Sequence, residues 1–320
     1  MRAIELHDHQ LSFRTDFSAP IAPAGEVNVR VLKAGICETD LQLVKGYMDF
    51  HGIPGHEFVG IAESGKFQGC RVVGEINCPC HECSTCRAGR PRHCPHRTVV
   101  GILNRNGAFA ELLSIPETSL HLVPDHVPNQ FAVFTEPVAA ACRILEQQLV
   151  QPTDSVLILG AGRLGNLCAQ VLKPQCHELL VVGKHAWKLS RIAECGIDSE
   201  ELPVFQPQAV WDVVVDCTGS QSGIETALQC VRPCGLIVLK TTIASEQSLH
   251  LAPIVIDETR IVGSRCGPFE PAIELIAEGR LQLAPLISAT YDIEAAVEAF
   301  QVSVRSDVLK VLLNIGGTES

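Results

Sequence analysis

Positive charge and long apolar runs are both scarce in this chain. Its 320 residues carry 25 Lys and Arg against 36 Asp and Glu, a formal net charge of −11. Because an acidic chain binds phosphate backbones poorly, we expect no nucleic-acid partner. No run of 18 or more apolar residues occurs, and the opening MRAIELHDHQ lacks the apolar core of a signal peptide. We therefore expect no membrane partner, no secretion and a cytoplasmic location.

Internal repeats and low-complexity stretches are also absent. Hydrophobic residues make up 46% of the chain and charged residues 19%, which excludes a disordered or collagen-like protein. A length of 320 residues exceeds what one hydrophobic core usually holds, so two domains are expected.

Cysteine, in contrast, is abundant. The chain has 15 cysteines, an odd number that cannot all pair as disulfides. In a reducing compartment, clustered cysteines more often bind metal or take part in catalysis than form disulfides.

The chain changes character near residue 135. Before it, short strands broken by Gly and Pro are predicted at 27–32, 58–62 and 71–76. After it, helices alternate with short apolar strands: helices at 137–149, 164–173, 186–194 and 223–231, strands at 155–159, 178–182, 211–216, 236–241 and 260–263. The tail returns to mixed structure, with helices at 271–278 and 293–303 and a strand at 308–313. This order predicts an α/β protein in which a doubly wound parallel sheet is inserted into a β-rich domain. The expected boundaries are 1–138, 139–267 and 268–320.

A glycine-rich hexapeptide follows the first apolar strand and opens a helix. Gly160, Gly162 and Gly165 fit G-x-G-x-x-G, with Arg163 and Leu164 before the last glycine. Such glycines permit a tight turn, close approach of the backbone to a pyrophosphate, and close packing of helix on strand. The motif alone is weak, because glycine-rich turns are common, but its place between strand and helix predicts a dinucleotide site.

The end of the next strand bears on which dinucleotide binds. A carboxylate there would hold the ribose 2′-hydroxyl of NAD(H) and repel the 2′-phosphate of NADP(H). Here the sequence has Gly183, Lys184 and His185, followed by Lys188 and Arg191. We therefore predict NADP(H) over NAD(H); the alternative is that these cations form a solvated helix face.

Four cysteines stand close together in the loop 78–96. Cys80, Cys83, Cys86 and Cys94 make C-x2-C-x2-C-x7-C. Four thiolates close the tetrahedral shell of a structural zinc ion. An iron–sulfur cluster is the rival, but the ferredoxin pattern has three residues before the last cysteine and this chain has seven. The spacing favours zinc.

A second set of metal ligands is dispersed along the chain. Cys37 follows an early strand, and His56 comes after a loop. Thiolate and imidazole suit zinc, and a catalytic zinc needs three protein ligands and one open position. Glu57 and Glu136 are the candidates for the third ligand.

Together these features resemble the zinc-dependent medium-chain dehydrogenases/reductases, the superfamily of alcohol, polyol, glucose and threonine dehydrogenases. The resemblance runs nearly end to end, over GICETD, GHEFVG, the four-cysteine loop, GAFAEL, FTEP, GAGRLG and AVEAF. It implies a GroES-like catalytic domain formed by both chain ends, a Rossmann domain between them, and a homodimer or homotetramer. It also implies hydride transfer between a nicotinamide dinucleotide and a small alcohol or polyol, or the corresponding aldehyde or ketone.

The resemblance assigns roles to single residues. Cys37, His56 and Glu136 match the ligands of a catalytic zinc, so that two zinc ions per chain are expected. Glu57 matches an acidic neighbour that can exchange onto the metal, and Thr39 matches the hydroxyl that relays the substrate proton.

Further positions support this arrangement or depart from it. Asp40 matches the carboxylate that orients the zinc-binding imidazole. Gln42 stands where many relatives have a histidine that passes the proton to solvent, and His51 is the candidate replacement. Glu38 would repel a pyrophosphate if it faced the cofactor.

Two alternatives to a zinc-dependent alcohol dehydrogenase remain. One is a zinc-free quinone or enoyl reductase on the same fold, although such relatives lack the metal-binding cysteine and histidine. The other is a non-catalytic NADP(H)-binding protein stabilised by zinc.

Overall fold

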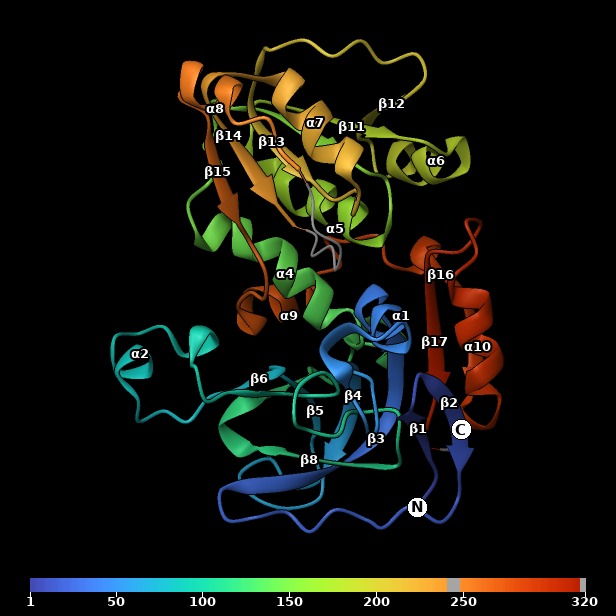
Figure 1. Ribbon diagram of the computed structural model, residues 1–320. Helices are drawn as coiled ribbons and strands as arrows, with labels where there is room; N and C mark the ends of the chain where they lie inside the picture. The colour runs from blue at the N-terminus through green and yellow to red at the C-terminus, as the bar shows by residue number, and fades with distance from the viewer. Residues whose placement is uncertain (241–247, 317–320) are drawn as a thin grey trace. The chain divides into compact units, whose positions relative to one another are not determined.

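The alternating segments of the central region form a six-stranded parallel sheet in the computed structural model, which describes residues 1–240 and 248–316 (Figure 1). In spatial order its strands are β12 (Asp198–Glu201), β11 (Glu178–Gly183), β10 (Ser155–Leu159), β13 (Trp211–Asp216), β14 (Val231–Leu239) and β15 (Arg260–Gly263). Numbered from β10, this order is 3-2-1-4-5-6, the order of the Rossmann fold. The predicted doubly wound sheet is therefore confirmed. Residue 241, the last of the predicted strand 236–241, lies outside the described residues.

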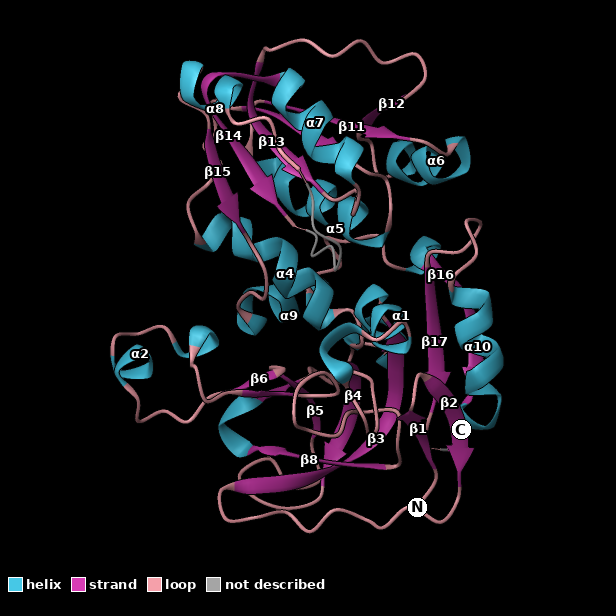
Figure 2. Cartoon of the chain, viewed as in Figure 1, coloured by secondary structure: helices cyan, strands magenta, loops and turns pink. Residues whose placement is uncertain are grey.

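Helices alternate with these strands, as Figure 2 shows. They are α5 (Arg163–Leu172), α6 (Ala186–Glu194), α7 (Gln221–Cys230) and α8 (Ala252–Ile256), with a 3-10 turn at Lys173–Gln175. The central strands are continuous apolar runs, and Leu157, Val214 and Ile237 are fully buried. Burial on both sheet faces accounts for this pattern, because helices cover a doubly wound sheet on both sides.

A mixed sheet of seven strands forms the core of the other part. Its strands are β3 (Glu26–Ile36), β4 (Glu57–Ala62), β5 (Arg71–Gly74), β8 (Leu112–Pro116), β9 (Leu120–Leu122), β16 (Ile287–Asp292) and β17 (Lys310–Asn314). Two small antiparallel pairs accompany it, β1 (Ala3–His7) with β2 (Gln10–Arg14) and β6 (Asn77–Cys78) with β7 (Thr98–Val99). The C-terminal strand β17 pairs with the N-terminal β3, so both chain ends build this sheet.

Short helices join these strands. They are α1 (Glu38–Val44), α2 (Ser84–Arg87), α3 (Asn129–Ala132) and α10 (Ala296–Ser303), with 3-10 turns at Tyr47–Asp49, Pro91–His93, Glu117–Ser119, Ala284–Leu286 and Ile293–Ala295. None of the helices in the described ranges has both the length and the apolar character needed to cross a bilayer.

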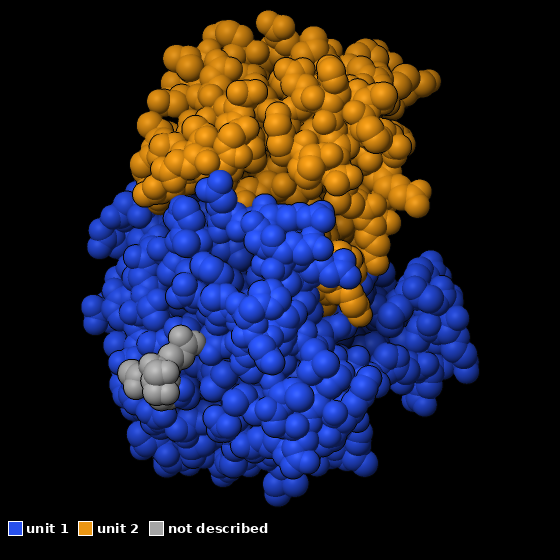
Figure 3. All heavy atoms as spheres, turned by 180° about the vertical axis from the view of Figure 1, so that it is seen from behind, with its two compact units in different colours: residues 1–136, 273–320 blue, residues 137–272 orange. Residues whose placement is uncertain are grey.

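The chain divides into two compact units, coloured in Figure 3. The first unit is Met1–Glu136 with Ile273–Ser320, and the second unit is Pro137–Ala272. Helices α4 (Thr135–Glu146) and α9 (Phe269–Ala277) contain the two boundaries. The sequence prediction set these boundaries after residues 138 and 267.

Candidate active site and zinc lobe

Cys37 and His56 lie next to each other at the ends of two neighbouring strands of the first unit. Cys37 follows the last residue of β3 and caps α1, and His56 directly precedes β4. The two strands are antiparallel, with Gly35 opposite Glu57, so the end of one strand lies beside the start of the other. One ligand atom from each of Cys37, His56 and Glu57 lies within 4.8 Å of the others.

The buried carboxylate of Asp40 holds these residues in place. It accepts hydrogen bonds from the backbone N–H of Cys37 at 2.8 Å and of Gly55 at 3.2 Å. One of its oxygens lies 3.3 Å from Nδ1 of His56, which leaves Nε2 of the imidazole available as a metal ligand. Burial alone would lower the pKa of His56, but the charge of Asp40 and contacts with Asp40 and Cys37 raise it well above its usual value.

A buried ion pair adjoins this group. Lys310, the first residue of β17, donates from Nζ to the carboxylate of Glu57 and, at 3.2 Å, to the backbone oxygen of Ile36. The side chains of Lys310 and Glu57 are only 2% and 1% exposed. Gly35 makes room for the pair, since a Cβ there would lie 2.6 Å from a carboxylate oxygen of Glu57. The sequence reading missed Lys310; a lysine within the apolar run VLKVLLNI was the available signal.

Three predicted positions besides Asp40 lie on α1. The hydroxyl oxygen of Thr39 is 4.0 Å from Sγ of Cys37, close to the expected metal site. The Gln42 amide donates to Glu38 at 2.8 Å on the exposed side of the helix. Glu38 and Gln42 therefore bind each other.

Glu136 is not part of the close group of ligand atoms. It is the second residue of α4 and the last residue of the first unit, and it is half-buried. Within the described ranges, the group around Cys37 and His56 contains Glu57 and not Glu136.

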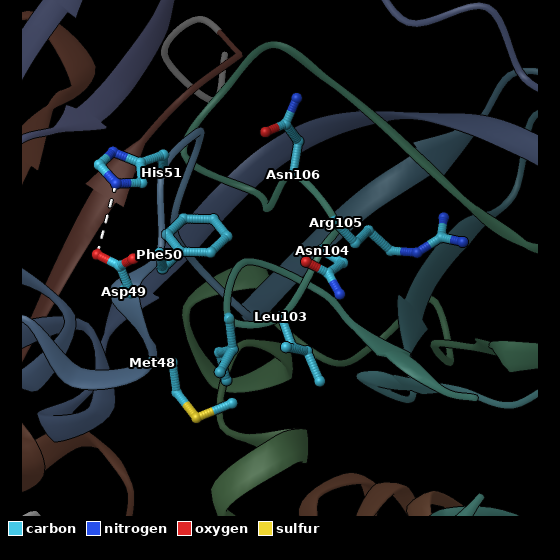
Figure 4. Close-up of a pocket in the computed structure, with 9 residues that line it drawn as sticks. Met48, Asp49, Phe50, His51, Leu103, Asn104, Arg105 and Asn106 are labelled. Carbon is cyan, nitrogen blue, oxygen red and sulfur yellow. Dashed lines mark ion pairs between the residues drawn. The ribbon is translucent and has the colours of Figure 1, made fainter. Parts of the chain in front are cut away.

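A pocket of about 250 Å³ lies in the first unit (Figure 4). Its walls are residues 48–51, in the loop before His56, and residues 102–106. Asn106 accepts a hydrogen bond from the N–H of Ile53 at 3.0 Å, which ties the two segments together. The sequence reading did not identify the second segment, because only tertiary pairing brings it beside the first.

The four clustered cysteines converge in a lobe between β6 and β7. Their sulfurs are 3.5 Å apart for Cys83 and Cys86, 3.5 Å for Cys80 and Cys94, and 3.8 Å for Cys83 and Cys94. Zinc–sulfur bonds of about 2.3 Å in a tetrahedron put the sulfurs about 3.8 Å apart. Backbone N–H groups, first among them those of Glu82 and Cys86, lower the pKa of Cys80 and bring that of Cys83 to about 7. Burial and the neighbouring thiols of Cys83 and Cys94 raise the pKa of Cys86 to about 12. The lobe thus fits a zinc ion in the spacing of its sulfurs.

The glycine loop lies at the carboxyl end of β10, where the strand order reverses between β10 and β13. Gly160 has a φ of 103°, and a Cβ on Gly165 would lie 1.8 Å from the Gly160 oxygen. A Cβ on Gly162 would meet nothing within 4 Å, so the space above this residue is open. Arg163 and Leu164 begin α5. The loop therefore fits a pyrophosphate.

The predicted selector residues lie at the end of β11. Gly183 is its last residue and His185 caps α6. Lys184 is exposed, and Nζ of Lys188 lies 5.3 Å from the ring centroid of Trp187.

Two carboxylates modify the charge around these cations. Arg191 donates to both oxygens of Glu194, at 2.7 and 3.0 Å, so this cation is paired along its own helix. Glu201, the last residue of β12, lies opposite Gly183 in the parallel register. The sequence reading missed Glu201 because it did not predict β12.

Comparison with known proteins agrees with this geometry. The family model "Alcohol dehydrogenase GroES-like domain" matches residues 23–125, and the model "Zinc-binding dehydrogenase" matches residues 165–278. A 2-dehydro-3-deoxy-L-galactonate 5-dehydrogenase of Pseudoalteromonas atlantica is 31% identical, over 90% of this chain and 91% of the relative. The chain belongs to the zinc-type medium-chain dehydrogenase/reductase family.

Other proteins resemble this medium-chain dehydrogenase over nearly its whole length. The D-arabitol-phosphate dehydrogenase of Enterococcus avium is 28% identical, over 95% of this chain and 94% of the relative. The crystal structure of an Escherichia coli short chain alcohol dehydrogenase with the cofactor NADH is 26% identical and has a TM-score of 0.89. That match covers 98% of this chain and 99% of the other.

Membership makes the chain an oxidoreductase that acts on small-molecule alcohols, with zinc and a nicotinamide dinucleotide as the cofactors of its family. The hypothesis of a non-catalytic protein is thereby set aside.

Proposed function

We propose that this enzyme is a zinc-dependent dehydrogenase that transfers a hydride between NADP(H) and an alcohol or polyol, or the matching aldehyde or ketone. The observation that carries the proposal is the grouping of Cys37, His56 and Glu57 at one sheet edge, with the Asp40 carboxylate behind the imidazole. Thiolate and imidazole are zinc ligands, and a carboxylate beside the ligating histidine is the usual support. A zinc-free quinone or enoyl reductase would not require these metal-binding side chains.

Cys37, His56 and Glu136 are the proposed ligands of the catalytic zinc. Glu57 binds Lys310, and we assign it as the neighbour that can exchange onto the metal. When bound, zinc supplies a Lewis acid that favours the ionised form of a substrate hydroxyl.

The chain's own residues hold and move the proton. The Thr39 hydroxyl, which both donates and accepts hydrogen bonds, would accept the proton of the substrate hydroxyl beside Cys37 while its own proton passes to solvent water. Asp40 keeps the imidazole of His56 oriented. Gln42 carries an amide and donates to Glu38, so it does not replace a histidine that passes the substrate proton to solvent.

The proposed dinucleotide site lies in the second unit. The pyrophosphate would be held by the glycine loop, namely Gly160, Gly162, Arg163, Leu164 and Gly165. The adenosine ribose would meet the residues Gly183, Lys184, His185 and Lys188. Lys184, His185 and Lys188 favour a 2′-phosphate, hence NADP(H), and their charge opposes that of Glu201, which lies opposite Gly183.

The proposed metal content is two zinc ions per chain, one catalytic and one structural. Cys80, Cys83, Cys86 and Cys94 would hold the structural ion, since four sulfurs already lie at nearly tetrahedral spacing. For the substrate, the relatives include a D-arabitol-phosphate dehydrogenase and a 2-dehydro-3-deoxy-L-galactonate 5-dehydrogenase, which directs a substrate screen toward polyols and sugar derivatives.

Metal analysis combined with kinetics tests the catalytic zinc. Cys37→Ser and His56→Ala should each lower the zinc content from two to one and reduce kcat/KM on the best alcohol by roughly 1000-fold or more, since metal catalysis supplies several kcal/mol. Cys70→Ser, at an exposed cysteine, is the matched control and should change neither value. Activity that survives either site variant would reject the catalytic zinc.

A second assay tests the choice of dinucleotide. Wild-type enzyme should have a lower KM for NADP(H) than for NAD(H), and Lys184→Ser with Lys188→Ser should raise only the KM for NADP(H). Arg191→Ser is the control, because that guanidinium is already paired with Glu194. A lower KM for NAD(H) in the wild type would overturn this part of the proposal.

A further inference from the structure

A pair of histidines lies on the first unit outside the proposed zinc and dinucleotide sites. Leu6 and Gly52 exchange two backbone hydrogen bonds, of 2.8 and 2.9 Å, and form an antiparallel bridge. The next pair along this bridge is His7 and His51. In antiparallel register a pair that follows a doubly bonded pair is a non-hydrogen-bonded one, in which side chains approach most closely. The two imidazole centroids are accordingly 5.2 Å apart.

Carboxylates flank both imidazoles. Nε2 of His7 lies 3.6 Å from an oxygen of Asp8, and Nε2 of His51 lies 3.6 Å from an oxygen of Asp49, the ion pair drawn in Figure 4. One ligand atom from each of His7, Asp8 and His51 lies within 4.8 Å of the others. Ligand atoms around a zinc ion with bonds of about 2.1 Å stand roughly 3–3.6 Å apart, so small side-chain rotations would close a shell here.

The backbone holds the two carboxylates in unusual conformations. Asp8 and His9 form the two-residue turn between β1 and β2, where His7 is opposite Gln10. Their φ angles of 46° and 63° are those of a type I′ turn. Asp49 also has a left-handed φ, of 47°. A backbone segment held in a turn of this kind loses less conformational freedom when its side chains bind a ligand.

We propose that His7, Asp8 and His51, with Asp49 beside them, form a surface site for a divalent transition-metal ion of the zinc class. Two imidazoles distinguish this group from an ordinary acidic cluster, because imidazole favours zinc, copper and nickel over calcium and magnesium. The four side chains are exposed, which allows an ion to enter from solvent.

The site joins two parts of the chain that are far apart in sequence. His7 ends β1, whereas Asp49 and His51 belong to the segment 48–51 that forms one wall of the pocket in Figure 4. A bound ion therefore ties this pocket wall to the hairpin of β1 and β2. The proposal does not depend on the substrate or the dinucleotide of the enzyme.

Zinc uptake by the full-length, untagged holoenzyme tests the site. After equilibrium dialysis against micromolar Zn²⁺, elemental analysis should find one more zinc per chain in the wild type than in His7→Gln or His51→Ala. Each variant should bind this additional ion at least about tenfold more weakly. His177→Gln, at an exposed histidine of the second unit, is the control and should bind zinc like the wild type.

Two further measurements keep the outcome decisive. With Cu²⁺ as the probe, electron paramagnetic resonance should show coupling to two nitrogens in the wild type and to one in His51→Ala. Asp8→Asn places asparagine, which also tolerates a left-handed backbone, at this position. Its zinc uptake therefore reports on the lost carboxylate charge without a change in the turn. Equal zinc uptake by the wild type and both histidine variants, or no uptake beyond the catalytic and structural ions, would overturn the proposal.

Discussion

Lys310 and Glu57 form a buried ion pair, and each charge lowers the free-energy cost of burying the other. Removal of one partner from a buried ion pair leaves an uncompensated charge, at a cost of about 3–5 kcal/mol. We therefore expect Lys310→Met to lower the free energy of unfolding by about that amount, because the carboxylate of Glu57 would remain 1% exposed without its partner. Urea denaturation of the metal-loaded enzyme measures the change.

A second substitution distinguishes this explanation from simple loss of packing. Adding Glu57→Gln to Lys310→Met removes the stranded charge and should recover most of the lost stability. If the double variant is as unstable as Lys310→Met alone, the ion pair is not the cause.

Arg105 gives a prediction with a defined pH dependence. Its guanidinium donates to both oxygens of Glu26, at 2.8 and 2.7 Å, and this pairing lowers the pKa of Glu26 below its usual 4.5. A carboxyl whose pKa is lower in the folded state stabilises the fold above the unfolded-state pKa and loses this contribution as pH falls through the folded-state value. Arg105→Met should therefore cost about 1.5–3 kcal/mol at pH 7, and less at pH 3.

Denaturation of both proteins at several pH values measures this difference. It should narrow as the pH falls from about 4.5, the usual pKa of Glu26 and that of the unfolded chain, through the lower pKa of Glu26 in the folded protein. Hydrogen bonds from Arg105 to Thr98 and to the backbone of Ser114 do not titrate, so part of the difference should persist in acid. A difference that stays constant from pH 7 to pH 3 would contradict the assignment.

At the scale of elements, the four-cysteine lobe gives the clearest test. Residues 80–93 are mostly exposed or half-exposed and their elements are short, so apolar burial contributes little to the folding of this lobe. A structural zinc supplies folding free energy directly. We expect Cys83→Ser to remove one zinc per chain and to lower Tm by roughly 5–10 °C. Thermal unfolding and elemental analysis check this, with Cys70→Ser as the control; unchanged zinc content and Tm would contradict it.

The sequence predicts elements best where burial determines the pattern. The strands Trp211–Asp216 and Arg260–Gly263 and the helix Ala186–Glu194 coincide with the predicted ranges 211–216, 260–263 and 186–194. Strand β12 was missed because its sequence is DSEE, and only backbone pairing with β11 makes it a strand. Strands β1 and β2, at the start of the chain, were missed as well.

The residues of the candidate site fall into two groups, those found from local motifs and those brought in by tertiary contacts. Local motifs lead to Cys37, His56 and the glycine loop because each is a short sequence with a fixed backbone geometry. Lys310 reaches Glu57 from 253 residues away, and residues 102–106 reach the pocket through tertiary pairing. No local pattern contains such contacts.

At the scale of the whole molecule, chain topology explains why the first unit needs both chain ends. Strand β17 forms hydrogen bonds with β3 and carries Lys310 to the buried Glu57, so the C-terminal segment completes the surroundings of the proposed zinc site. The second unit has its own sheet and its own apolar core, around Leu157, Val214 and Ile237. The insertion of one folded unit into another thus leaves each with a complete core.

The homodimer or homotetramer that the family resemblance implies would have a candidate surface on the second unit. Among the residues that the structure describes, β15 is the last strand in the order of the sheet, and an edge strand pairs readily with another chain. Just before it in sequence, Leu251, Val255 and Ile256 are 62%, 75% and 77% exposed. Exposed apolar side chains close in sequence to an edge strand are typical of a protein interface.

Substitution of this surface tests the assembly. We expect Val255→Asp with Ile256→Glu to weaken self-association by roughly 100-fold, because charges replace apolar side chains at the centre of the contact. Analytical ultracentrifugation over a range of concentrations measures the change. Val204→Asp, at a valine of the second unit that is 63% exposed, is the matched control and should leave the assembly unchanged. If the double variant associates like the wild type, the subunits meet through a different surface.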